Sequence, residues 1–143
     1  MYIVLYDRAS AACSMSESVK IFFDGGYRPV LGEMETAVVA RGALHHQPRL
    51  GPGSSEEAEW LALLHALRVA RMLGVPNIIL VGDSASVINQ AKGVTTCRAA
   101  ACLENYRDQL RHFAHVRLRQ VPRTQNLAGI ALARLRNGAG HPI

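Results

Sequence analysis

Three acidic residues lie where a fold could bring carboxylates together. Asp24 and Asp83 each follow a strand-like apolar run, and Glu59 lies near the start of a long helical pattern. Carboxylates gathered in one place repel one another and raise one another's pKa unless a cation joins them. Oxygen ligands suit Mg²⁺ or Mn²⁺, which keep several waters and also bind substrate phosphates. The three residues therefore predict a divalent-metal site.

Each of these acids also has an ordinary explanation when it is taken alone. Asp24 would lie in a strand-end turn, and Glu59 would oppose the positive end of a helix dipole. Asp83 or Ser84 would cap the following helix, which is the favoured interpretation of a lone strand followed by Asp-Ser. The metal-site hypothesis therefore depends on the combination of the three.

Positive charge is concentrated in one segment of the chain. The net charge is +5 at pH 7, and Arg98–Arg136 alone carries eight arginines against Glu104 and Asp108. A basic segment on an otherwise balanced domain favours a polyanionic partner, and arginine is well suited to phosphate. The alternative is a solvated basic surface. Together with the three acids, the segment predicts a metal-dependent enzyme that acts on phosphodiesters.

The elements that must position these side chains alternate between strand-like and helical patterns. Strands are expected at Met1–Leu5, Val19–Gly26 (ending at Asp24), Thr36–Leu44, Ile78–Val81 and His115–Val121. Helices are expected at Ser54–Leu73, Ala85–Lys92, about Arg98–Phe113 and Leu127–Arg136. The run before Asp83 is apolar on both faces, which suits a sheet's interior, and ligands bind at the carboxyl ends of such strands. The order predicts an α/β fold with a mixed sheet flanked by helices.

Size and composition fit one globular domain over residues 1–143. Hydrophobic residues make up 49% of the chain and charged residues 19%, which is ordinary for a globular protein. We expect residues 1–18 to be an irregular lead-in and residues 138–143 to fray. No apolar run is long enough to span a membrane, and the N-terminus does not resemble a signal peptide. Cys13, Cys97 and Cys102 lack metal-binding spacing, which favours a reducing, cytoplasmic location.

Four different short motifs follow one another along the chain. They are Ile21–Gly25, Ser55–Ala62, Val81–Ser84 with Val87–Gln90, and Val121–Asn126. In this order and spacing they resemble the type 1 ribonuclease H family, and the resemblance extends from about Val19 to Leu135. It implies a ribonuclease H-like fold, a five-stranded mixed β-sheet flanked by α-helices on both sides. It also implies an endonuclease that uses Mg²⁺ or Mn²⁺ to hydrolyse the RNA strand of RNA/DNA hybrids.

The resemblance also implies roles for individual residues. Asp24 would bridge two metal ions, and Glu59 and Asp83 would be the other ligands of one of them. Two such ions would stabilise the attacking water and the leaving oxygen. Gly25 would bring its backbone close to the RNA strand, and Arg123 with Asn126 would contact nucleic acid, where Arg123 could hold a phosphate.

One position departs from the family pattern. The family's last helix usually carries a fourth carboxylate, and Ile130 stands at the corresponding position here. No Asp or Glu follows Asp108, so a shift in helix register cannot restore one. Asp7, Glu33, Glu35 or a water are the candidates to replace it.

Two functions therefore remain open. The first is an endonuclease whose activity is impaired, which the three retained carboxylates favour. The second is a catalytically inactive domain on the same fold that binds nucleic acid or another partner. Ile130 and the altered glycine-rich turn at Gly25–Val30 favour this second function.

Overall fold

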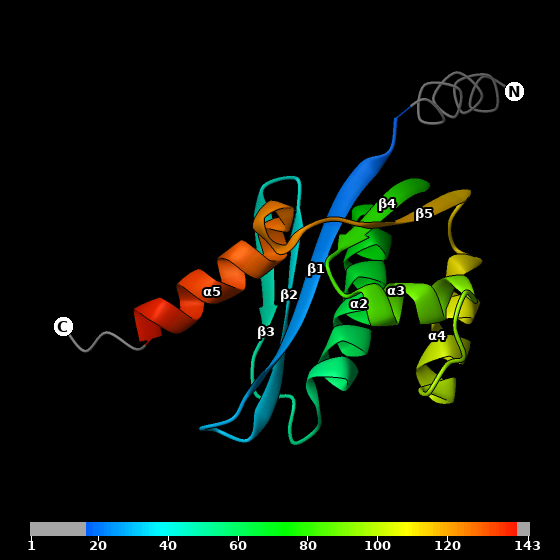
Figure 1. Cartoon of the computed structure of the whole chain (residues 1–143). Coiled ribbons are helices and arrows are strands. Elements are labelled where there is room, and N and C mark those ends of the chain that lie inside the picture. The colour runs from blue at the N-terminus through cyan, green and yellow to red at the C-terminus, as the bar shows by residue number, and fades with distance from the viewer. Residues whose placement is uncertain (1–16, 140–143) are drawn as a thin grey trace, which may run out of the picture.

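The computed structural model describes residues 17–139 (Figure 1). Its strands are β1 (Val19–Arg28), β2 (Glu33–Ala40), β3 (Ala43–Gln47), β4 (Asn77–Gly82) and β5 (His115–Gln120). They form one sheet in the order β3-β2-β1-β4-β5, in which β1 pairs antiparallel with β2 and parallel with β4. This confirms the predicted five-stranded mixed sheet. The strand expected at Met1–Leu5, together with Asp7 and Cys13, lies outside the described residues.

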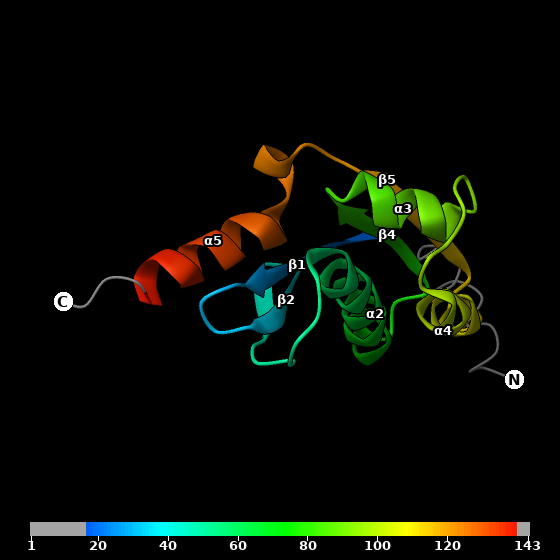
Figure 2. The same cartoon turned by 60° about the horizontal axis from the view of Figure 1, so that its bottom comes forward.

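Helices cover both faces of the sheet. They are α2 (Ser55–Leu73), α3 (Ala85–Lys92), α4 (Ala100–Leu110), the short 3₁₀ helix η1 (Arg123–Gln125) and α5 (Leu127–Ala139). Because side chains alternate along a strand, Ile21 and Phe23 of β1 join the main core with α2, α3 and α4. Phe22 points to the other face and packs in a smaller cluster with α5. Figures 1 and 2 show α2 and α5 on opposite sides of β1.

Helix α2 begins and ends at the residues that the sequence predicts. The Ser54 hydroxyl accepts a hydrogen bond from the Glu57 amide at 3.1 Å, which caps the N-terminus. Gly74 ends the helix in the left-handed conformation, with φ of 69°, where glycine has no steric cost. Small residues of this helix, including Ala62 and Ala66, are fully buried. These small side chains allow α2 to lie close against the sheet.

Two strand predictions were wrong. The run Thr36–Leu44 was expected to be one strand, but it contains a hairpin. Arg41 and Gly42 both have positive φ, 51° and 78°, and such a two-residue turn matches the twist of antiparallel strands. Residues before this turn belong to β2, and those after it form β3.

The other error concerns the end of β1. The strand was expected to end at Asp24, before Gly25 and Gly26, but β1 continues to Arg28 because β2 stays paired with it throughout. Asp24 therefore lies within a strand. A Cβ at Gly25 would overlap the Ala58 carbonyl of α2, so glycine here permits a close approach of helix and strand.

The remaining boundaries differ slightly. Helix α4 covers Ala100–Leu110, within the expected Arg98–Phe113, and α5 extends to Ala139, beyond the expected Arg136. Over residues 17–139, no helix combines the length and the apolar character needed to cross a membrane.

Candidate metal centre

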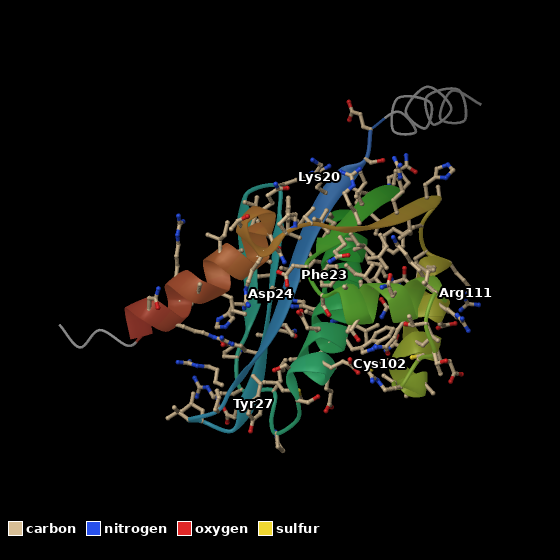
Figure 3. All side chains as sticks on the ribbon, in the orientation of Figure 1. Lys20, Phe23, Asp24, Tyr27, Cys102 and Arg111 are labelled. Atoms are coloured by element: carbon tan, nitrogen blue, oxygen red, sulfur yellow. The ribbon has the colours of Figure 1, made fainter. Side chains whose placement is uncertain are left out.

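The site forms where β1 and β4 separate. The pairing of these two parallel strands ends at Phe22 and Val81. Asp24 and Asp83 each lie two residues beyond the last pair, where no backbone bonds fill the space between the strands. Glu59 reaches this gap from the first turns of α2. Figure 3 shows Asp24 partway along β1, between α5 and α2.

The three predicted carboxylates come together there. One oxygen from each of Asp24, Glu59 and Asp83 lies within 4.8 Å of the others, and no further group of three or more potential metal ligands occurs in residues 17–139. Asp24 is buried, whereas Glu59 and Asp83 are half-buried. The cluster is therefore partly accessible to solvent through Glu59 and Asp83.

Two backbone and side-chain contacts orient the ligands. The amide of Gly25 donates to Glu59 Oε1 at 2.8 Å, and the approach of this glycine to RNA stays a prediction. The Asn126 amide group donates to Asp83 Oδ2 at 2.8 Å and to the Phe23 carbonyl at 2.9 Å. Asn126 is fully buried. Asn126 thus supports Asp83 from within the protein, and its contact with nucleic acid stays a prediction.

Ser84, and not Asp83, caps helix α3. Ser84 is the N-cap of α3, and its hydroxyl accepts from the Val87 amide at 3.3 Å. Asp83 is therefore not needed as the cap and turns toward Asp24 and Glu59. Of the two residues that the sequence offered as a cap, Ser84 caps the helix and Asp83 belongs to the carboxylate cluster.

The electrostatics of the cluster favour binding of a cation. Burial, followed by the charge of Asp83, raises the pKa of Asp24 to about 6. Burial, followed by the charge of Asp24, raises the pKa of Glu59 to about 8. Carboxylates with such values disfavour ionisation unless positive charge is supplied. Three convergent oxygen donors are also the ligand type that Mg²⁺ and Mn²⁺ prefer, so the residues present fit a divalent ion.

On the α5 side, the cluster has no fourth acid. Helix α5 contains no Asp or Glu, and its residue Gly129 lies close to the cluster. A Cβ there would lie 3.4 Å from Asp24 Oδ2 and 3.6 Å from Asp83 Oδ2. Ile130 follows it, half-buried. That Ile130 occupies the place of a fourth ligand stays a prediction.

Glu35 and Glu33 were candidates to replace the fourth ligand, but Glu35 binds other side chains and Glu33 lies farther along the sheet. Glu35 is buried, and its carboxylate accepts from Arg136 Nε at 2.7 Å and lies 3.0 Å from His46 Nε2. Glu33 lies opposite Arg28, four residues along β1 from Asp24. Neither residue belongs to the group that could hold a metal ion.

Arginines border the site. Arg123 is exposed on η1, and its charge lowers the pKa of both Asp24 and Glu59 against the effect of burial. Arg136 of α5 acts on Asp24 in the same direction. The sequence singled out Arg123 but not Arg136, whose only signal was its membership of the basic segment.

Known proteins resemble the chain in sequence pattern and fold. The family model described as reverse transcriptase-like matches residues 23–136. A ribonuclease H1 from the halophilic archaeon Halobacterium salinarum is 26% identical with a TM-score of 0.70, over 81% of this chain and 94% of that one. No curated protein sequence matches the chain.

Two further structures are similar in fold. The N-terminal RNase H domain of a Mycobacterium tuberculosis protein is 23% identical, with a TM-score of 0.70 over 85% of this chain and 98% of that one. LC11-RNase H1, whose solved structure is a complex with an RNA/DNA hybrid, is 21% identical. Its TM-score is 0.61, over 77% of this chain and 89% of that one.

Proposed function

The chain belongs to the reverse transcriptase-like family and has a ribonuclease H-like fold, and on this premise we propose that it is an endonuclease that hydrolyses the RNA strand of RNA/DNA hybrids. The observation that carries the proposal is the meeting of Asp24, Glu59 and Asp83 within 4.8 Å. A similar ribonuclease H1 was solved with an RNA/DNA hybrid, which supports the substrate class.

The three acids would hold Mg²⁺ or Mn²⁺. When bound, such an ion supplies Lewis-acid stabilisation of charge on the phosphate and lowers the pKa of a coordinated water. The chain's own residues fix the ligand geometry: Gly25 restrains Glu59, and Asn126 restrains Asp83. Restraint of ligands by such hydrogen bonds raises metal affinity and activity.

Arg123 would hold a phosphate of the nucleic acid beside the acids. It is exposed, and its charge already acts on Asp24 and Glu59. Arginine binds phosphate with paired donors. This contact would place the phosphodiester beside the carboxylate cluster.

Two free thiols, Cys97 and Cys102, fit a cytoplasmic location.

A second function rests on a specific observation, the absence of any acid from α5. A site of three carboxylates would then serve only to bind a hybrid through metal and arginine, without cutting it. The two functions differ in one measurable property, which is turnover.

The test is cutting of an end-labelled RNA/DNA hybrid in Mg²⁺ or Mn²⁺. The matched variants are Asp83→Asn, which removes a ligand, and Asp108→Asn, which makes the same change at an exposed acid on α4. The proposal expects cutting by the wild type and Asp108→Asn, and none by Asp83→Asn. Salt-sensitive hybrid binding without cutting by the wild type in either metal would refute the nuclease and support the binding domain.

A further inference from the structure

A small cavity adjoins Asp24 on the α5 side. Its volume is about 160 Å³, and its polar lining comes from Asp24, Arg123, Arg136 and Asn137. A water molecule occupies about 30 Å³ in the liquid, so the cavity has room for a phosphate group. Among the described residues that line it, two are cationic and one is acidic. This balance of charge differs from that of the adjoining cluster, which consists of three carboxylates.

Glu35 holds the side chain of Arg136 in place. Its Nε donates to Glu35 Oε2 at 2.7 Å, and Glu35 is 2% exposed. Burial alone would raise the pKa of Glu35, but the hydrogen bonds from Arg136 and His46 hold it below its ordinary value. Arg136 therefore has an ionised, buried anchor that fixes its guanidinium at the cavity wall.

β1 and β2 are shaped to admit this guanidinium. Gly26 and Glu35 face each other in the register of the two strands, on the side of the sheet that carries Asp24. A Cβ at Gly26 would overlap Arg136 Nη2, so the glycine leaves room for it. Nη2 is buried and has no hydrogen-bond partner in the described residues. Because Gly26 covers Nη2, the cavity is lined by the rest of the Arg136 side chain, which is 33% exposed.

Anions and cations would fare differently here. A second metal ion on this side of Asp24 would meet two arginines and one carboxylate, and like charges in a partly buried site repel strongly. A phosphate would meet two guanidinium groups, its preferred partners. We propose that this cavity is an anion subsite in which Arg123 and Arg136 bind a phosphate group of the nucleic acid. Arg136 is then a binding residue, and Glu35 and Gly26 are its positioning residues.

The inference rests on the proposed function only in naming nucleic acid as the source of the phosphate. It also alters the expectation of two metal ions that the family resemblance implies. Asp24 would contact the ion held with Glu59 and Asp83, and the adjoining cavity would take a phosphate held by arginine. The chain would then hold one ion.

The first test uses inorganic phosphate as the probe. Phosphate is titrated at constant ionic strength with Mg²⁺ present, and amide and arginine Nε–H signals are followed by NMR. We expect saturable shifts of Gly129 and Arg136, but not of Arg134, an exposed arginine on the same helix. Arg136→Gln should weaken phosphate binding about tenfold, Arg136→Lys should retain most of it, and Arg134→Gln should leave it unchanged.

A separate variant protects the test against a failure to fold. Gly26→Ala keeps Arg136 but displaces its guanidinium, so it should also weaken phosphate binding. The proposal is overturned if Gly129 shows no saturable shift. It is equally overturned if Arg136→Gln and Gly26→Ala both bind phosphate as tightly as the wild type.

The second test identifies the source of the phosphate. Hybrid binding is measured against salt concentration in an Asp83→Asn background, with and without Arg136→Gln. Loss of one phosphate contact should make the slope of log K against log salt less steep by about 0.9. An unchanged slope would overturn the assignment to nucleic acid and point to a free phosphate. Failure of the nuclease proposal itself would appear separately, as absence of cutting by the wild type.

Discussion

Binding of Mn²⁺ should release protons from the carboxylate cluster. Burial and neighbouring charge raise the pKa of Glu59 to about 8 and that of Asp24 to about 6, and a carboxylate must be deprotonated to bind a metal ion. At pH 7, Glu59 is about nine-tenths protonated and Asp24 about one-tenth, so each ion should displace about one proton. The same arithmetic gives about one and a half protons at pH 6 and about half a proton at pH 8. Metal affinity should therefore rise with pH.

Isothermal titration calorimetry measures this release. Mn²⁺ is titrated into metal-free protein in buffers of different ionisation enthalpy, and the slope of observed heat against that enthalpy gives the protons released. Glu59→Gln removes the group with the most strongly raised pKa and should reduce the release at pH 7 to about a tenth of a proton. Glu57→Gln changes an exposed acid in the same helix and should behave as the wild type.

Two results would refute this reasoning. The first is a release well below half a proton at pH 7, which would mean that the acids are already ionised without the metal. The second is a release by Glu59→Gln equal to that of the wild type, which would place the protons on other groups.

Three further substitutions test the supports of the site. Gly25→Ala should lower the free energy of unfolding by about 1–3 kcal/mol because its Cβ would overlap the backbone of α2. Gly138→Ala is the control, since the space around Gly138 is open, and it should not lower this free energy. Urea unfolding compares the two variants, and equal stabilities would contradict the close approach of β1 and α2. Asn126→Ala removes the donor to Asp83 and should weaken Mn²⁺ binding about tenfold to a hundredfold by calorimetry; unchanged affinity would show that Asp83 needs no such restraint. Ile130→Asp should raise the Mn²⁺ stoichiometry from one toward about two ions, and a stoichiometry that stays at one would contradict the position assigned to the fourth ligand.

The sequence predicted the parts of the fold that local patterns specify. Helix α2 has a capping serine, acids in its first turn and a terminal glycine, so both of its ends were predictable. The buried run before Asp83 indicated an interior strand, because apolar side chains on both faces suit only that place. These two elements placed Glu59 at a helix start and Asp83 at a strand end, and the family resemblance implied that the two residues share a site.

Features that depend on tertiary packing were not predictable in the same way. Gly25-Gly26 normally breaks a strand, but here pairing with β2 continues the strand, and α2 and the guanidinium of Arg136 lie where side chains would be. Arg41 has a positive φ that arginine rarely adopts, so the hairpin had only Gly42 as its signal. The anchoring of Arg136 by Glu35 joins residues 101 positions apart, and no local pattern reveals it.

The central claim is that Asp24, Glu59 and Asp83 together bind a divalent ion, and anomalous scattering from a Mn²⁺-loaded crystal tests it most directly. The account predicts one strong peak within coordination distance, about 2.2 Å, of an oxygen from each of the three residues. A matched crystal of Asp83→Asn should show that peak weakened or lost. A wild-type crystal in saturating Mn²⁺ with no peak at these three side chains would contradict the account.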